Sequence, residues 1–562
     1  MKRYLITSAL PYINGIKHLG NLVGSLLPAD IYARYLRQRG EEVLYICGTD
    51  DYGAPAEIAA NEEQLPVTEY CQKMHDRQKQ IYHDFALSFD YFGKTATASN
   101  QLVTQEIFQQ LDANDYISEK SIEQYYSITE NRFLSDRYII GTCPKCNYNK
   151  ARGDQCDGCG SLLDPIDLIE PHSNFNMHAI LQLRQTSHLF LDLPKLQNQI
   201  QQWTESLKKP SKVVAGIIKK WLAEGLDYRC ITRDLDWGIP VPKTNYTDKV
   251  FYVWFNAPMG YISLTMDWAQ QLGTPELWRS WWLNTDEVHY TQFMAKDNVP
   301  FHAVMWPAML LGSQQNWKLV DNIKGFNWLT YAGGKFSTSQ KRGVFTDEAL
   351  KLFPADYWRY YLIANVPESS DADFSFVTFA QIINNDLADN LGNFIARVLA
   401  LVEKYFQSMV PNHEFMHIDR ELFAQIQTIC TTIDHAYSDL KYREIIVNLR
   451  SLWALGNEYI TKKQPWSMVQ QNLAQAGYIL SDCLHLIRIF AITLWPIMPT
   501  IAEKIGSLVF PGENITKINF VAAMNLVCLP IGSQVAPKTT IFNKIDAELV
   551  SELTVQFSGN SF

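Results

Sequence analysis

The spacing of hydrophobic residues divides the chain into a part with alternating strands and helices and a later, wholly helical part. Near the start, the pattern predicts a strand at 4–7, a helix over 19–38 and a second strand at 43–47. Apolar residues recur at helical spacing in the helix and form a short continuous run in the second strand. This order is typical of the opening of a parallel sheet, whose ligands bind at the carboxyl ends of the strands. Similar β-α character returns at 288–312, and the sequence from about 376 to 507 predicts helices throughout.

The composition is that of an ordinary globular protein, because 47% of the 562 residues are hydrophobic and 19% are charged. A chain of this length has room for several domains, each with its own core. No apolar stretch reads as a secretory signal or a bilayer span, so we expect no membrane partner. The six cysteines outside the paired set described below are scattered without pattern, which indicates reduced thiols and a cytoplasmic protein. The net charge of −10 neither indicates nor excludes nucleic-acid binding, which depends on local basic patches.

Four of the ten cysteines form two Cys-x-x-Cys pairs. Cys143 and Cys146 make the first pair, and Cys156 and Cys159 make the second. Two such pairs can bind one zinc ion through four thiolates, and the glycines beside them suit the tight turns of a zinc knuckle. A four-thiolate shell leaves no open position for water, so we predict one structural zinc ion rather than a catalytic one.

Two short segments carry groups suited to phosphate chemistry. His18 and Gly20 stand at the predicted start of the first helix, where free backbone N–H groups and the helix dipole attract an anion. Some 300 residues later, the segment 333–339 is a glycine-rich loop with a lysine and hydroxyl groups. Each segment alone is equally compatible with an ordinary solvated loop, so the argument rests on their occurring together.

Together, these segments resemble the HIGH and KMSKS signatures of class I aminoacyl-tRNA synthetases, in the right order around the cysteine-rich insertion. The chain is similar to the methionyl-tRNA synthetases in further segments, namely Ser-Ala-Leu-Pro-Tyr at 8–12, Gly-Thr-Asp-Asp-Tyr-Gly at 48–53, the stretch 253–261 and Phe-Met-Ala-Lys-Asp-Asn at 293–298. The resemblance implies ATP-dependent activation of L-methionine to methionyl-adenylate and its transfer to tRNA(Met). This is the reaction of a methionine–tRNA ligase, which supplies initiator and elongator methionyl-tRNA.

The resemblance also implies an α/β fold. Its Rossmann-type parallel sheet is split by the zinc-knuckle insertion and is followed by an α-helical bundle that binds the anticodon. The expected domains are the first catalytic half at 1–116, the insertion at 117–232, the second catalytic half at 233–323, a linker fold with the KMSKS-like loop at 324–375, the helical domain at 376–535 and a C-terminal extension at 536–562. Nothing in that extension resembles an added tRNA-binding module through which relatives dimerise, so we expect a monomer.

Positions that match the family motifs indicate the residues that contact ATP. His18 and Asn21 would act at the α-phosphoryl group, and Lys335 at the β- and γ-phosphates together with magnesium. Asp297 would hold the ribose. The remaining expected ATP contacts are Gly20, Ser337, Thr338 and Ser339.

Matching positions also indicate the methionine pocket and the anticodon site. Asp50 would pair with the α-ammonium of methionine, and aromatic rings would contact the sulfur. The other expected pocket residues are Leu10, Tyr12, Trp254, Ala257, Pro258, Tyr261, Phe301, His302 and Trp306. Asn393, Arg397 and Trp466 would read the anticodon CAU, although without the resemblance Trp466 reads as a core residue.

Two residues depart from the signatures. Asn21 replaces the last histidine of HIGH but still donates a hydrogen bond, whereas Thr338 replaces the second lysine of KMSKS with a neutral hydroxyl. Thr338 therefore leaves open a non-catalytic tRNA-binding relative. A synthetase for another amino acid, such as leucine or cysteine, is disfavoured by the aromatic pocket and by the absence of a large editing insertion.

Overall fold

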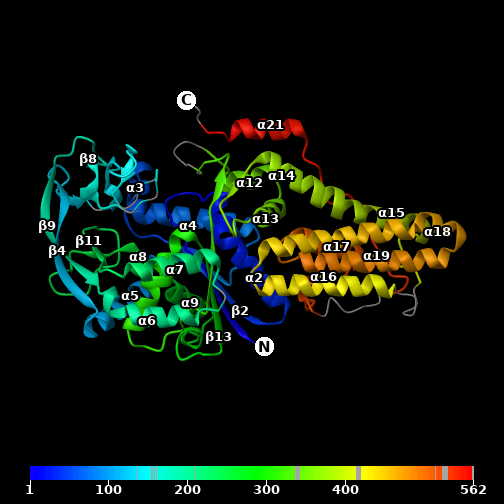
Figure 1. Cartoon of the computed structure of the whole chain (residues 1–562), viewed down its shortest axis with the longest axis horizontal. Coiled ribbons are helices and arrows are strands. Elements are labelled where there is room, and N and C mark those ends of the chain that lie inside the picture. Colours follow the sequence, from blue (N-terminus) through cyan, green and yellow to red (C-terminus); the bar gives the residue numbers. More distant parts are fainter. Residues whose placement is uncertain are drawn as a thin grey trace.

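The computed structural model describes residues 1–134, 136–153, 156, 158–159, 161, 163–208, 210–334, 336, 342–412, 419–512, 514–521 and 530–559. Four residues of the expected ATP site, Lys335, Ser337, Thr338 and Ser339, lie outside this set. Figure 1 shows an elongated molecule, with the α/β part and the insertion on the left and a long helical bundle on the right.

A five-stranded parallel sheet lies at the centre of the α/β part, in the order β14-β13-β1-β2-β3. Its strands are β1 (Arg3–Ser8), β2 (Glu42–Thr49), β3 (Tyr91–Lys94), β13 (Val288–Ala295) and β14 (Asn322–Phe326). The chain winds outward from β1 in one direction first and returns to the other side of β1 about 240 residues after β2. The junction of β1 and β13 is therefore the switch point at which such sheets bind ligands.

The predicted strands at 4–7 and 43–47 and the helix between them are confirmed. The helix is made of α1 (Leu19–Asn21), a π-helical stretch (Leu22–Leu26) and α2 (Leu27–Gln38). Helices α4 (Val67–Asp84), α5 (Ala98–Ala113), α8 (Val253–Asn256), α9 (Gly260–Gln271) and α11 (Trp306–Gly312) surround the sheet, and a second π-helical stretch (Phe301–Met305) leads into α11.

The insertion forms its own antiparallel sheets at the far left of Figure 1. The larger sheet contains β4 (Ile117–Ser127), β5 (Arg132–Leu134), β9 (Leu181–Leu191) and β10 (Arg229–Cys230). The smaller one, which holds the paired cysteines, contains β6 (Ile139–Thr142), β7 (Ala151–Arg152) and β8 (Ile169–Ser173). Helices α6 (Leu193–Ser206) and α7 (Lys212–Glu224) lead the chain back toward the central sheet.

The helical domain begins with α14 (Phe376–Ile382), which continues through a π-helical stretch (Ile383–Gly392) into α15 (Asn393–Phe406). It also contains α16 (Arg420–Ser438), α17 (Tyr442–Lys463), α18 (Pro465–Gln471), α19 (Leu473–Leu494) and α20 (Pro499–Val509). By length and composition, α19 could cross a membrane, contrary to the sequence-based expectation, but 94% of its apolar stretch is buried among the other helices. The apolar character of α19 is thus accounted for by its place in the core of the bundle.

The linker fold after the sheet contains β15 (Leu329–Tyr331), α12 (Thr346–Leu352), α13 (Ala355–Ala364) and β16 (Ala372–Phe374). The last described helix, α21 (Ala547–Gln556), returns to this region at the top of Figure 1. There the backbone N–H of Gly343 donates a hydrogen bond of 3.2 Å to the carbonyl of Phe557. The C-terminal segment is therefore tied to the chain just after the KMSKS-like loop.

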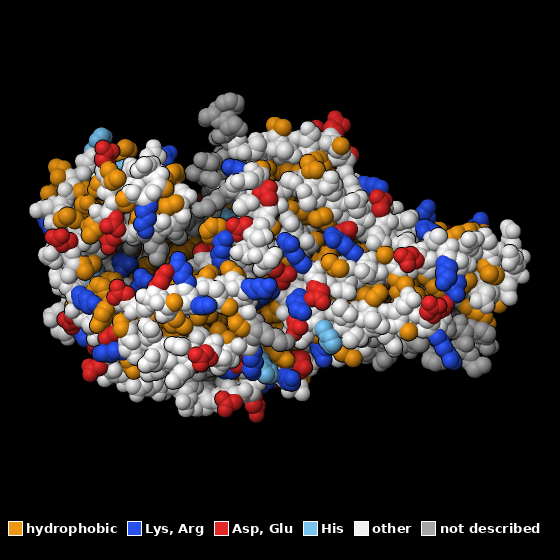
Figure 2. Space-filling model, viewed as in Figure 1, with side chains coloured by type: hydrophobic (Ala, Val, Ile, Leu, Met, Phe, Trp, Pro, Cys, Tyr) orange, Lys and Arg blue, Asp and Glu red, His pale blue; other side chains and the backbone are white. Residues whose placement is uncertain are grey.

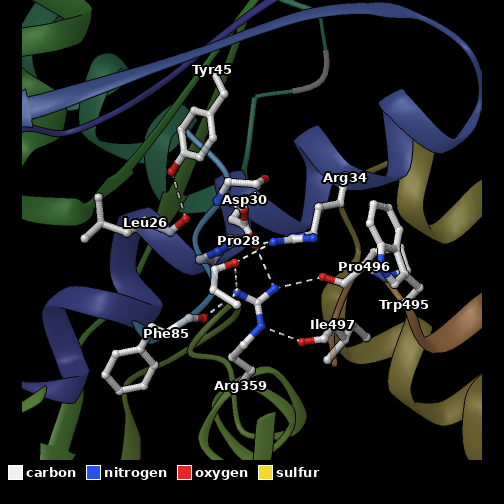
Figure 3. A network of polar contacts seen from close by, with 12 residues as sticks. Leu26, Pro28, Asp30, Arg34, Tyr45, Phe85, Arg359, Trp495, Pro496 and Ile497 are labelled. Atoms are coloured by element: carbon white, nitrogen blue, oxygen red, sulfur yellow. Dashed lines mark hydrogen bonds and ion pairs between the residues drawn. The ribbon is translucent and has the colours of Figure 1, made fainter. Parts of the chain in front are cut away.

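A buried arginine joins the sheet, the linker fold and the helical bundle (Figure 3). Arg359 of α13 donates to the carboxylate of Asp30 on α2 at 2.7 Å, and both side chains are 0% exposed. It also donates to the carbonyl of Phe85, after α4, and to the carbonyls of Pro496 and Ile497, after α19. A buried guanidinium needs hydrogen-bond acceptors for its N–H groups, and this carboxylate and these carbonyls provide them in fixed directions.

Candidate active site and anticodon interface

A cavity of about 930 Å³ opens beside the carboxyl ends of β1, β2 and β13. Figure 2 shows the surface hollowed between the insertion and the α/β body on this side of the molecule. The cavity is lined by thirteen residues expected from the sequence, namely Leu10, Tyr12, His18, Gly20, Asn21, Asp50, Trp254, Ala257, Pro258, Tyr261, Asp297, Phe301 and His302. Residues from five separate parts of the chain therefore meet around one space.

His18 caps the first helix at the edge of this cavity. Its backbone N–H donates to Oδ1 of Asn21 at 3.2 Å, which fixes the start of α1. The imidazole stacks on Phe336 with a centroid separation of 4.4 Å, so the two signature segments are in contact. Burial and the adjacent Lys17 lower the pKa of His18 to about 3, and its Nδ1 has no hydrogen-bond partner among the described residues. The ring is thus neutral at physiological pH, and its Nδ1 is available for a hydrogen bond to a ligand.

Gly20 has a steric reason to be glycine. A Cβ atom at this position would lie 2.9 Å from the imidazole of His18 and 3.3 Å from the carbonyl of Leu329. Any side chain here would displace the histidine from the helix start.

Asp50, directly after β2, places a carboxylate inside the cavity. It is 3% exposed, and its Oδ1 has no hydrogen-bond partner in the described part of the chain. Burial and the neighbouring Asp51 raise the pKa of Asp50 well above its ordinary value, while Lys17 opposes that rise. A buried carboxylate oxygen without a partner is costly, and a ligand ammonium group would relieve that cost.

Aromatic side chains form the wall next to Asp50. Trp254 and Phe301 stack with centroids 3.7 Å apart and planes inclined by 7°. Nδ1 of His302 donates to the carbonyl of Asn298 at 2.9 Å, so Nε2 must accept the 2.7 Å hydrogen bond from the Tyr261 hydroxyl. Burial lowers the pKa of His302 to about 4, which keeps this ring neutral as well.

Trp306 is placed differently from the other expected pocket residues. It is 0% exposed and is not among the residues that line the cavity. Its ring meets that of Tyr261 edge-on at 6.3 Å, behind the wall. In this structure Trp306 therefore supports the wall rather than forming its surface.

Asp297 lies just after β13 and lines the same cavity. Its Oδ1 accepts a hydrogen bond of 3.2 Å from Nε1 of Trp328, which lines the cavity as well. The sequence motifs contain Asp297 but give no indication of Trp328, which comes from a segment that only the fold brings to the site. Lys17, directly before His18 in the sequence, also lines the cavity.

The four paired cysteines come together in the insertion. Their sulfur atoms all lie within 4.8 Å of one another, with 4.0 Å between Cys143 and Cys159 and 3.6 Å between Cys146 and Cys156. Tetrahedral zinc with bonds of roughly 2.3 Å separates its sulfur ligands by roughly 3.8 Å. The donor set and its spacing therefore fit one zinc ion.

The expected anticodon residues lie at the far end of the helical domain. Asn393 begins α15 and is exposed, and Arg397 lies one turn later on the same helix. Trp466, at the start of α18, lies under the guanidinium of Arg397, whose Cζ is 5.5 Å from the indole centroid. The indole is partly buried against the core, so one part of it packs inward while Arg397 covers another.

Two models of known protein families match the chain. A family model described as class I tRNA synthetases (M) matches residues 4–399, and one described as the anticodon binding domain of methionyl tRNA ligase matches residues 410–561. The chain belongs to the methionyl-tRNA synthetase family. The predicted fold class and the predicted methionine–tRNA ligase activity are thereby confirmed.

Individual relatives agree with the family models. Methionine–tRNA ligase 1 of Acaryochloris marina is 48% identical, over 99% of this chain and 100% of the relative. Methionine–tRNA ligase of Streptomyces avermitilis is 47% identical, over the full length of both chains. A solved structure of Mycobacterium tuberculosis methionyl-tRNA synthetase in complex with methionyl-adenylate matches with a TM-score of 0.77 and 25% identity, covering 96% of this chain and 100% of that one.

Proposed function

We propose that the cavity beside β1 and β13 forms methionyl-adenylate from L-methionine and ATP and then esterifies the 3′ end of tRNA(Met). The observation that carries this proposal is the meeting, in one cavity, of the neutral His18 and of Asp50, a buried carboxylate whose Oδ1 has no hydrogen-bond partner among the described residues. One group suits an ammonium ion, and the other suits a phosphate at a helix start.

Adenylate formation requires positioning more than proton transfer. The carboxylate of methionine is already ionised at neutral pH, so no general base is needed to generate the nucleophile. The neutral imidazole of His18 and the amide of Asn21 would donate hydrogen bonds to charge that develops on the α-phosphate. Lys335 would neutralise the leaving pyrophosphate, where magnesium bound to ATP supplies further positive charge.

Methionine would bind between Asp50 and the aromatic wall. Asp50 holds the α-ammonium, while Trp254, Phe301 and Tyr261 offer ring surfaces to the thioether. Because one methylene is worth only about 1–3 kcal/mol in an apolar pocket, shape alone discriminates weakly among aliphatic side chains. Favourable sulfur–aromatic contacts would add to that discrimination.

The other parts of the molecule would serve tRNA and the fold. Arg397 and Trp466, with Asn393, offer a cation, a ring and an amide to the unpaired bases of the anticodon. The four thiolates would hold one zinc ion that maintains the insertion, because no coordination position is left for water. We further propose a monomer that acts in the cytoplasm.

The test is ATP–pyrophosphate exchange measured separately with each of the twenty amino acids. We expect robust exchange with methionine and at least a hundredfold less with leucine or cysteine. Binding of tRNA(Met) without methionine-dependent exchange would instead identify a non-catalytic tRNA-binding protein and attribute the loss to Thr338.

A further inference from the structure

Cys230 differs from the other cysteines outside the zinc knuckle that the structure describes. Cys47, Cys71, Cys430 and Cys483 are buried, whereas Cys230 is partly exposed and lines the main cavity. Burial raises the pKa of the four buried thiols, which keeps them protonated and unreactive. The proposed reaction gives no task to Cys230.

Strand pairing brings a buried histidine next to this thiol. Cys230 of β10 pairs with Phe190 of β9, and His188 lies two residues before Phe190, on the same face of the strand. Sγ of Cys230 lies 3.5 Å from the carbonyl oxygen of Thr232, in β11 (Thr232–Arg233), whose hydroxyl is 2.9 Å from Nδ1 of His188. The imidazole is 0% exposed and does not line the cavity, so it lies behind the thiol.

An aspartate on the far side of the imidazole orients it. Nε2 of His188 lies 3.0 Å from Oδ2 of Asp234. Oδ1 of Asp234 accepts a hydrogen bond from the buried ammonium group of Lys249, which also donates to the hydroxyl of Thr186. A thiol, an imidazole and a carboxylate in this order are the arrangement that activates nucleophilic cysteines in enzymes.

These groups stabilise the thiolate of Cys230. Burial opposes ionisation, but His188 and the positive charge of Arg233 together lower the pKa of Cys230 below its ordinary value. Arg233 is held beside the thiol, because its Nη1 donates to the carbonyl of Cys230 at 3.5 Å and to that of Thr232 at 2.9 Å. Burial also opposes the charged form of His188, yet Asp234 and Cys230 raise the pKa of this ring. The thiol and the imidazole thus favour each other's ionised form.

We propose that hydrogen peroxide oxidises Cys230 and that a small thiol then caps it, which closes the cavity reversibly. In the first step, the sulfur attacks one peroxide oxygen, so that an S–O bond forms and the O–O bond breaks. The sulfur loses two electrons to the peroxide, and the leaving hydroxide takes a proton from the imidazolium of His188 and departs as water. In the second step, a thiol such as glutathione attacks the sulfenic acid. An S–S bond forms, the S–O bond breaks, and the thiol proton leaves with the hydroxyl group as water.

A mixed disulfide at Cys230 would obstruct the space in which methionine and ATP meet. A tripeptide such as glutathione, fixed to the wall of a cavity of about 930 Å³, leaves less room for the substrates. This consequence rests on the proposed function, whereas the reactivity of Cys230 does not. Reduction of the disulfide would reopen the cavity.

The first test measures reactivity without catalysis. The wild type, His188→Gln and His75→Gln are treated with iodoacetamide at pH 6.5, and mass spectrometry follows the alkylation rate of each cysteine. His75 is the matched control, because it is also buried and its Nδ1 also lies near a threonine hydroxyl, at 3.0 Å from that of Thr49. We expect Cys230 to react at least about tenfold faster than Cys71 in the wild type and roughly tenfold more slowly in His188→Gln. His75→Gln should keep the wild-type rate at Cys230.

The second test follows the modification itself. After treatment with hydrogen peroxide, dimedone should label Cys230 as a sulfenic acid, and with glutathione present Cys230 should gain one tripeptide. Methionine-dependent exchange should then be lost in proportion to the fraction of Cys230 that is capped, and dithiothreitol should restore it. Cys230→Ser should keep its basal exchange and lose this response, while Cys71→Ser should respond like the wild type.

The outcomes separate this proposal from the proposed function. Equal alkylation of Cys230 and Cys71 in the wild type would overturn the reactive thiol, and this comparison holds even if His188→Gln does not fold. Equal alkylation of Cys230 in the wild type and in folded His188→Gln would overturn its activation by the histidine. Capping of Cys230 without loss of exchange would overturn the closing of the cavity. Capping in a protein that never shows methionine-dependent exchange would retain the reactive thiol and overturn the proposed function instead.

Discussion

The junction around Arg359 gives the sharpest prediction about stability. Replacing Arg359 with Met keeps a long apolar side chain but removes one of the two arginines that pair with Asp30. It also takes a donor from backbone carbonyls in two segments, after α4 and after α19. Removing one member of a buried ion pair costs about 3–5 kcal/mol. We therefore expect Arg359→Met to lower the free energy of unfolding by that amount at pH 7.

The pKa of Asp30 sets how this loss depends on pH. Burial opposes the charged form, yet Arg34, Arg359 and Ser88 together lower the pKa of Asp30 to about 2. Compared with an ordinary aspartate near 4, this contributes about 2–3 kcal/mol, present above pH 4 and lost as the pH falls through 2. In Arg359→Met, Arg34 and Ser88 still favour the charged form, but the contribution of Arg359 is lost, so the pKa of Asp30 should rise toward its ordinary value. The variant would then take up a proton at a higher pH than the wild type, and its deficit should shrink between pH 7 and pH 3.

The measurement is urea unfolding at both pH values, with hydrogen exchange of the amides in α2 and α13 as a local probe of the same opening. The matched control is Lys544→Met. Its ion pair with Asp389 is equally short, at 2.7 Å, but both side chains are more than half exposed. We expect that control to cost at most about 1 kcal/mol. A loss for Arg359→Met as small as the control's, or one that does not change with pH, would refute the reasoning.

Three further predictions concern the candidate sites. We expect His18→Ala to slow pyrophosphate exchange by about 2.7–4 kcal/mol of transition-state energy, with the KM for methionine within about twofold. Because the pKa of His18 is about 3, its titration should not affect the exchange rate between pH 6 and 8. Cys146→Ser should release the single zinc ion, measured by metal analysis, and expose the insertion to proteolysis. Trp466→Ala should keep wild-type exchange but charge tRNA(Met) more slowly by about 1–3 kcal/mol, and Arg397→Ala should behave alike.

Specific results would contradict each of these. A large loss of methionine affinity with an unchanged forward step would remove His18 from the phosphate. Two zinc ions per chain, or none in the wild type, would refute the single knuckle. If Trp466→Ala lost exchange and thermal stability together, the indole would be a core residue.

The chemistry of the site was predictable where it depends on short segments. His18, Gly20 and Asn21 follow one another, and their arrangement at a helix start is a local property of the chain. The strand and helix around them were predictable because their apolar residues repeat with a fixed period. The π-helical turn at 22–26 was not, since a shifted hydrogen bond leaves the periodicity almost unchanged.

The contacts between distant residues that position the site could not be predicted from the sequence. Trp254 and Trp306 are equally plausible pocket residues in the motifs, yet only the fold shows that one faces the cavity and the other lies behind it. Arginine is rarely buried, so nothing in the sequence distinguishes Arg359 from a surface residue.

The central sheet, which carries the cavity, and the helical bundle cannot move independently without breaking directional hydrogen bonds. One apolar core runs from Ile6 of β1 to Ile489 of α19, so the sheet and the bundle share buried surface. Apolar contacts alone tolerate sliding, because dispersion and burial depend little on direction. The guanidinium of Arg359 does not tolerate such sliding, because it donates hydrogen bonds to Asp30 and to the carbonyls after α4 and α19 at the same time. The core thus stabilises the contact between the sheet and the bundle, and the buried arginine defines the orientation of the proposed anticodon site relative to the proposed adenylate cavity.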